Sequence, residues 1–150
     1  MKRLYVYVIA VYLITTATAG SAQGTNNPAL FSAFPSTINC SETELARAFN
    51  MAEGQSISLS FSAGFVFPGG VISNIQQYNN LQTAVIRSPF YNNAVFNLSR
   101  ITNPDQSITY TGHIVNIAYS DGFTLKKDVT GNYQLQKFET ARLYANCTKL

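Results

Sequence analysis

The chain has 150 residues, of which 46% are hydrophobic and only 11% are charged. Ten basic and seven acidic residues give a formal net charge of +3. Two of the basic residues, Lys2 and Arg3, stand at the amino end, and without them eight basic residues face seven acidic ones. This balance excludes the basic footprint of a nucleic-acid-binding protein. One histidine and two cysteines are too few ligands for a Cys/His zinc site.

Residues 1–22 have the three parts of an export signal. The basic pair precedes an apolar run over 4–14, and small residues follow that allow cleavage after Ala19 or Ala22. The run is shorter than the roughly 20 residues of a membrane-spanning helix, which favours a cleaved signal peptide over an uncleaved anchor. We therefore expect a protein that is exported, either to the periplasm or to the extracellular space as a secreted protein, and that has no membrane span after cleavage.

Two parts follow the signal. Residues 23–39 mix turn formers with isolated apolar residues, which is typical of a flexible amino-terminal segment. Residues 40–150 have the length of a single domain, and Cys40 and Cys147 lie near its two ends. In an oxidising compartment such a pair forms a disulfide, with two buried free thiols as the alternative.

The domain opens with a helix signal. Ser41 and Glu44 have the spacing of a capping box and precede apolar residues on one helical face, so we expect a short helix over 42–51. Apolar residues then alternate with small ones over 57–67, which predicts a half-buried strand. The turn formers Pro68-Gly69-Gly70 are expected to end it.

Further strands are expected between turns rich in Asn, Gly, Pro and Asp. They are predicted over 71–75, 81–87, 94–101, 107–119, 123–129 and 133–138. Within 107–119 the alternation changes phase beside Gly112, which indicates a bulge or a strand buried on both faces. Residues 139–147 fit either a last strand or a helical turn. About seven strands and one short amino-terminal helix predict an all-β fold, a small closed or partly open antiparallel barrel, with a sandwich as the alternative.

Tyrosines beside asparagine pairs are the candidate ligand-binding residues. They combine a flat stacking surface with amide hydrogen bonds, which suits sugars or peptides, although tyrosines at strand ends are also common in packing. The predicted ligand-binding residues are Tyr78, Asn79, Asn80, Tyr91, Asn92 and Asn93.

Catalytic, cofactor and metal sites have little support. His113 is the only histidine, and no serine stands in a Gly-x-Ser-x-Gly motif that would form a triad with it. The carboxylates occur at a helix cap and in turns, and none has EF-hand spacing. We therefore expect no cofactor, no metal and no catalytic residue.

These observations together predict a non-enzymatic β-domain that acts as a binding or interaction module. Its partner would be a protein, a peptide or a carbohydrate, and not a nucleic acid. One alternative is a secreted hydrolase that uses His113. Another is a protease inhibitor or accessory protein that presents the segment 23–39 to its partner.

Overall fold

The computed structural model describes residues 27–141, so the expected signal peptide at 1–22 and Cys147 lie outside the described residues. Within this range the chain has eight strands. They are β1 (Thr37–Cys40), β2 (Ser56–Ser60), β3 (Val66–Tyr78), β4 (Leu81–Ser88), β5 (Ala94–Thr102), β6 (Ile108–Val115), β7 (Asp121–Lys127) and β8 (Tyr133–Glu139). Helix α2 (Glu42–Arg47) continues into the 3-10 turn η1 (Ala48–Asn50), and the 3-10 turn η2 (Pro89–Tyr91) joins β4 to β5.

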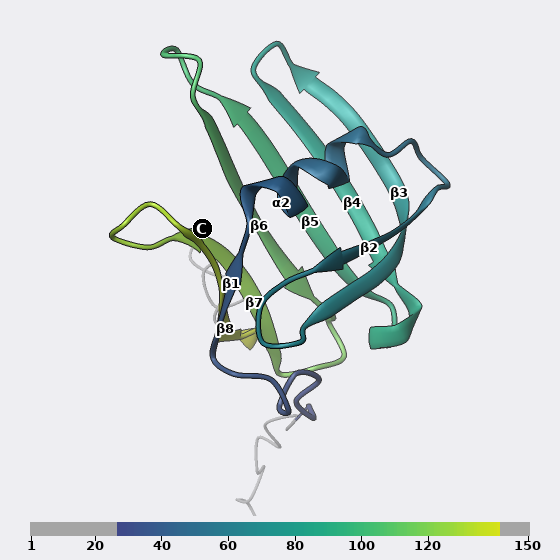
Figure 1. Ribbon diagram of the computed structural model, residues 1–150. Coiled ribbons are helices and arrows are strands. Elements are labelled where there is room, and N and C mark those ends of the chain that lie inside the picture. The colour runs from purple at the N-terminus through teal and green to yellow at the C-terminus, as the bar shows by residue number, and fades with distance from the viewer. Residues whose placement is uncertain (1–26, 142–150) are drawn as a thin grey trace, which may run out of the picture.

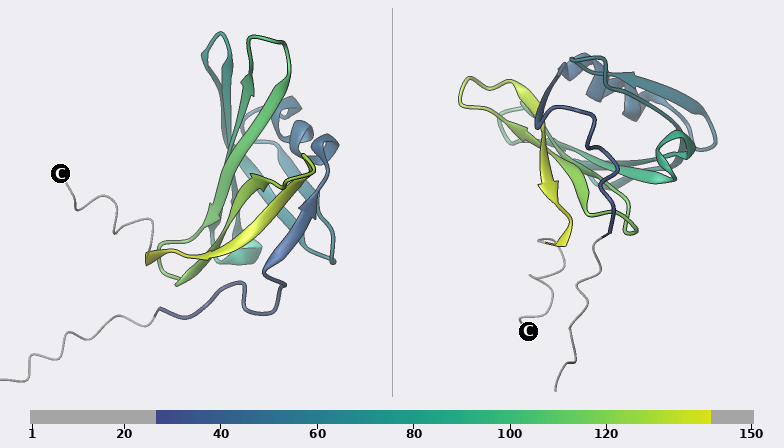
Figure 2. Two further views of the ribbon diagram at one scale, coloured as in Figure 1. Left: turned by 90° about the vertical axis from the view of Figure 1, so that its left-hand side faces the viewer. Right: turned by 90° about the horizontal axis from the view of Figure 1, so that it is seen from below.

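All eight strands belong to one antiparallel sheet with the order β1-β8-β7-β6-β5-β4-β3-β2. Strands β2 to β8 form a meander, and β1 pairs with β8, so the first strand of the domain joins the last (Figure 1). The sheet curls strongly and brings β2 back in front of β4 and β5 (Figures 1 and 2). This curled half-barrel confirms the predicted all-β class and, because there is one sheet, decides for a barrel over a sandwich.

Helix α2 and η1 lie across the open side of the curled sheet (Figure 1). Leu45, Ala48 and Phe49 are buried there against the core. The predicted helix over 42–51 is therefore present, but its α-helical part ends at Arg47 and a 3-10 turn completes it. Ser41 caps the helix as expected, since its hydroxyl accepts the Glu44 N–H at 3.2 Å.

The strand predicted over 57–67 is instead a hairpin. Strand β2 ends at Ser60 and β3 begins at Val66, and Ala63 and Gly64 between them have φ of 56° and 70°. This left-handed backbone turns the chain back on itself. The alternation does not reveal the turn, because both strands of a hairpin present their apolar side chains to the same face of the sheet.

The stretch 68–70 does not end a strand but lies inside β3. The missing N–H of Pro68 would face β4, and β4 pairs with β3 only from Gly70 onward. A proline at this point therefore removes no hydrogen bond from the sheet. Pro68 is tolerated inside β3 because β4 does not pair with the strand at this residue, while β2 pairs with Pro68, Gly69 and Gly70 on the other side.

Strand β6 is regular and has no bulge at Gly112. Its pairing with β5 runs without a register shift from Val115 to Ile108. The change of phase arises because the strand ends at Val115, after which the Asn116 side chain accepts the Ala118 N–H at 2.9 Å in a turn. The register shifts lie in β3 instead, in its pairing with β4.

Strands β6 and β7 separate over part of their length. They pair only from Gly112 to Ile114, and the earlier half of β6 has no strand neighbour on that side. The Tyr110 N–H donates there to the hydroxyl of Tyr133 from β8 at 2.9 Å, and the Tyr133 ring is buried. The Tyr133 hydroxyl thus accepts a hydrogen bond from a backbone N–H of β6 that has no strand partner, because β6 and β7 are separated there.

The segment before β1 lies at one end of the barrel, below β1 in Figure 1. Asp121 accepts the N–H groups of Leu30 and Phe31 at 2.6 and 3.0 Å, and Lys137 Nζ donates to the carbonyls of Phe31 and Phe34 at 2.7 and 2.6 Å. The Phe31 ring is fully buried in an aromatic cluster that includes Phe65, Tyr91 and Phe123. The segment 23–39, expected to be flexible, is thus packed against the domain from Leu30 onward.

Candidate functional site

The structure places His113 on the outer face of β6, where it is exposed. Its neighbours in register are Asn97 on β5 and Thr124 on β7. No hydroxyl or carboxylate among residues 27–141 forms a hydrogen bond with its imidazole. The described part of the chain therefore assembles no Ser-His-Asp arrangement around this histidine.

No group of three His, Cys, Asp or Glu side chains among the described residues could hold a metal ion. None of the helices in this part of the chain is both long enough and apolar enough to span a bilayer.

The two predicted tyrosine clusters do not form one site. Tyr78 ends β3 and lies in the hairpin that leads into β4, whereas Tyr91 follows the other end of β4. Eight strand residues separate the clusters, which is about 25 Å at the rise of a β-strand. Tyr78 is 69% exposed, and Asn79 and Asn80 beside it are also exposed.

The second cluster differs from the first, because its tyrosine is buried. Tyr91 is only 8% exposed and its hydroxyl donates to the Val66 carbonyl at 2.9 Å, and burial raises its pKa. Asn92 and Asn93 have φ of 52° and 66°, a left-handed conformation that asparagine tolerates. The Asn92 amide also donates to the Tyr119 hydroxyl at 2.7 Å. The Tyr91 ring is therefore part of the core, whereas Asn92 and Asn93 are exposed in the turn between η2 and β5.

The aromatic side chain that the sequence analysis missed is Phe90. It is 74% exposed although Tyr91 beside it is buried, and the two rings meet edge to face at 5.0 Å. The feature that explains the exposure of Phe90 is the 3-10 turn that begins at Pro89. Successive side chains of such a turn diverge by about 120°, so Tyr91 cannot enter the core unless Phe90 points away from it.

Phe90 borders an open groove of about 660 Å³ on the outer surface beside β2 and β3, which we call the Phe90 groove. Its lining includes Ser56, Ser58, Pro68, Gly70, Pro89 and Phe90. Gly70 leaves the floor bare, because a Cβ atom at this position would meet nothing within 4 Å. The groove therefore combines an aromatic wall, two proline rings and two exposed serines.

Arg87 lies next to this groove. Its Cα is the register partner of Gly70, and its side chain is exposed because the flanking Ile86 and Ser88 point into the core. No residue among 27–141 forms an ion pair, a hydrogen bond or a ring contact with the Arg87 guanidinium. The Arg87 guanidinium, which has no partner among residues 27–141, thus lies beside the Phe90 groove.

A second groove, of about 530 Å³, lies where the two edges of the curled sheet meet, and we call it the seam groove. Asn39 on β1 and Ser62 after β2 join the edges there. Gln134 in its wall already donates to Asn39 at 3.1 Å and to Asp128 at 3.3 Å. The aromatic rings in its lining, Phe61 and Tyr133, are buried. The polar wall of this groove is therefore engaged in closing the barrel.

Cys40 also lines the seam groove and carries a free, buried thiol. Burial raises its pKa to about 12, so the thiol is neutral at physiological pH. Cys147, the expected disulfide partner, lies outside the described residues. The predicted disulfide is therefore not present in the described structure.

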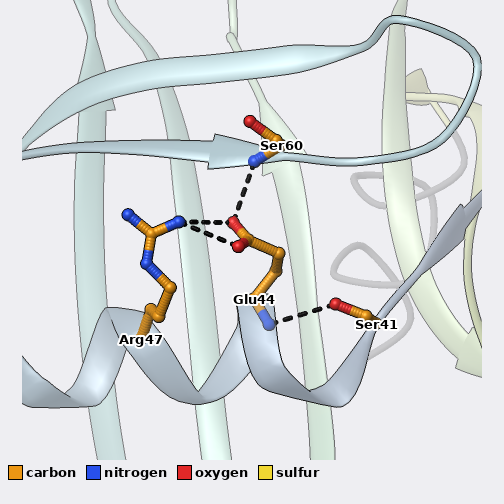
Figure 3. Close-up of polar contacts among 4 residues, drawn as sticks. All are labelled: Ser41, Glu44, Arg47 and Ser60. Atoms are coloured by element: carbon orange, nitrogen blue, oxygen red, sulfur yellow. Dashed lines mark hydrogen bonds and ion pairs between the residues drawn. The ribbon is translucent and has the colours of Figure 1, made fainter.

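Glu44 forms a hydrogen bond with the free edge of β2 beside the seam (Figure 3). Its carboxylate accepts the Ser60 N–H at 3.0 Å and pairs with Arg47 at 2.8 Å, and these contacts lower its pKa, the backbone hydrogen bond most of all. The capping box predicted a return bond from Glu44 to the start of the helix. The carboxylate instead satisfies a strand N–H that would otherwise be open to another chain.

The chain was compared with family models, with curated proteins and with solved structures. None of the three comparisons finds a match. The candidate site consists of the exposed Phe90 ring, the groove that it borders and the Arg87 guanidinium next to that groove.

Proposed function

We propose that this protein is a secreted or periplasmic, non-enzymatic binding domain and that its ligand lies in the Phe90 groove. The observation that carries the proposal is the exposure of Phe90, the one exposed phenylalanine among the described residues. Moving such a ring out of water is worth about 2 to 3 kcal/mol. An exposed aromatic ring that borders a groove can supply the aromatic contact on which binding interfaces commonly depend.

The groove stands on parts of the fold that are held in place. Strands β2 and β3 pair in register from Ser56 to Ser60, and the Tyr91 hydroxyl bonds η2 to the Val66 carbonyl. A ligand would therefore meet a surface that is already formed, which limits the entropy cost of binding. The seam groove is less suited, because its polar side chains already bond one another.

The two alternatives draw less support. The hydrolase would need a hydroxyl and a carboxylate near His113, and the described neighbours of His113 in register are an asparagine and a threonine. The inhibitor would present the segment 23–39, but Phe31 and its neighbours anchor that segment to the domain. The binding domain needs neither arrangement.

We test the proposal by NMR titration of the protein lacking residues 1–22. The probes are N-acetylphenylalaninamide, as a neutral aromatic peptide unit, and cellobiose, as a carbohydrate. We expect amide shifts at Ser56, Ser58 and Gly70 with at least one probe, and their loss in Phe90→Ala. Tyr78→Ala removes another exposed aromatic ring about 25 Å away and should change nothing. Shifts that are absent with both probes, or that survive Phe90→Ala, would refute the site.

A disulfide between Cys40 and Cys147 is part of the same proposal. Its support is the expected export together with the position of Cys40, which lines a groove open to the surface. Oxidised glutathione would accept the two electrons by thiol–disulfide exchange and leave as two thiols. The intact protein would then be about 2 Da lighter than its reduced form. Equal masses before and after reduction of the secreted protein would rule the bridge out.

A further inference from the structure

We infer that the Phe90 groove recognises the carboxyl terminus of a peptide whose last side chain is apolar, with Arg87 holding the terminal carboxylate. The inference rests on the proposed function, because it names the ligand class of the same groove. It adds Arg87, which does not line the groove but stands at its border.

The charge at this border is not compensated. Arg87 has no ion-pair or hydrogen-bond partner within residues 27–141. An exposed guanidinium presents a planar fork of N–H donors that matches a carboxylate in a bidentate arrangement. A ligand carboxylate at this point would therefore form an ion pair with Arg87 and two parallel hydrogen bonds with its guanidinium.

The position of the charge relative to the ring selects the ligand. Arg87 near the end of β4 and Phe90 in η2 are three residues apart. Gly70 pairs with Arg87 and lines the groove with Phe90, and a Cβ atom at Gly70 would meet nothing within 4 Å. The Cα atoms of Arg87 and Gly70 face each other in register, about 5 Å apart in an antiparallel pair. An apolar side chain against Phe90 would thus place a carboxylate on the same residue within reach of Arg87.

The serines favour a peptide over a simple acid. Ser56 and Ser58 are exposed in the lining, and no hydrogen bond engages their hydroxyls. A hydroxyl can donate to a peptide carbonyl and accept from a peptide N–H. The amide that precedes the terminal residue would therefore find partners that an aryl or alkyl acid lacks.

Matched small probes test the inference. N-acetylphenylalanine carries the carboxylate, N-acetylphenylalaninamide does not, and 3-phenylpropionate carries the carboxylate without the amide. By NMR titration of the protein lacking residues 1–22, we expect N-acetylphenylalanine to bind about tenfold tighter than either of the other two. This advantage should shrink as salt is raised. Arg87→Gln should remove the advantage over the amide, and Arg87→Lys should restore it in part.

The outcomes separate the two claims. If the acid and the amide bind equally and Phe90→Ala abolishes both, the groove stands and the role of Arg87 is refuted. If 3-phenylpropionate binds as tightly as N-acetylphenylalanine, the peptide assignment is refuted. If none of the three probes shifts the groove amides, both the inference and the proposed site fail. Arg87 is exposed, so its variants should keep the wild-type spectrum away from the groove.

Discussion

Asn39 and Ser62 exchange two hydrogen bonds across the seam of the barrel. The Asn39 N–H donates to the Ser62 hydroxyl at 2.7 Å, and the Ser62 N–H donates to the Asn39 carbonyl at 3.0 Å. These residues belong to opposite edges of the sheet, since β1 and β2 are its two outermost strands. The contact therefore turns an open curled sheet into a nearly closed one and leaves less free edge for another chain.

Replacing Ser62 by alanine should loosen this seam. The variant keeps one of the two bonds and leaves the Asn39 N–H without its acceptor, so we expect a loss of about 1 kcal/mol in the free energy of unfolding. Urea denaturation measures the loss, and amide exchange at Asn39 should become faster. Ser58→Ala, on the edge strand β2 that precedes Ser62, is the control. An equal effect of both substitutions would argue against a specific role of the seam contact.

Glu44 should make the stability depend on pH. Because its folded pKa is lowered by the Ser60 N–H and by Arg47, its contribution is present above the unfolded pKa of about 4.3 and is lost as pH falls through the folded pKa. Glu44→Gln should therefore flatten the fall in unfolding free energy below about pH 4.3. Glu42→Gln, in the same helical turn, is the control. An unchanged acid slope in Glu44→Gln would contradict the role of this carboxylate.

Asp121 should be the main polar anchor of the segment before β1. Its two oxygens accept from two backbone N–H groups, whereas an asparagine has one acceptor and would turn an N–H donor toward another donor. We expect Asp121→Asn to cost about 2 kcal/mol in unfolding free energy. Asp105→Asn, in an exposed turn, should cost little, because asparagine also suits such a turn. Unfolding by urea compares the two, and similar losses would disprove the anchor.

Ser88 and Thr140 should respond in opposite directions. The Ser88 hydroxyl is buried and has no hydrogen-bond partner among residues 27–141, whereas the Thr140 hydroxyl donates to the Tyr119 carbonyl at 2.7 Å. Removing an unsatisfied buried group should stabilise the protein, so we expect a gain of about 1 kcal/mol for Ser88→Ala. We expect a loss of about 1 kcal/mol for Thr140→Val. Thermal unfolding measures both, and destabilisation by Ser88→Ala would show that the hydroxyl has a partner.

The neighbouring rings of η2 should differ in their contribution to stability. Tyr91→Ala removes a buried ring that contacts Phe65 and Phe67, and it should cost about 3 kcal/mol or more. Phe90→Ala removes an exposed ring and should change the unfolding free energy by less than about 0.5 kcal/mol. Chemical denaturation of both variants measures the difference. A large loss with Phe90→Ala would mean that this ring is packed and would weaken the proposed site.

The sequence by itself determined the local elements of this protein. Alternating side chains predicted β4, β5 and β8 nearly to the residue, and Ser41 marked the start of the helix. These features depend on neighbours within a few positions, so a periodic pattern is enough to locate them. The same pattern predicted the all-β class, because seven such runs with few helix signals leave only sheets to build a core.

Only the tertiary structure decided how those strands meet and which side chains reach the surface. Asp121 and Phe31 are 90 positions apart, and the two edges that Asn39 and Ser62 join are strands with no local signal for pairing. The hairpin at Ala63 was hidden for a related reason, since alternation tells which side of a strand a residue faces but not where the strand reverses. Whether Tyr91 or Phe90 would be exposed likewise depended on the core that forms around them, because a side chain is buried by residues distant in the sequence.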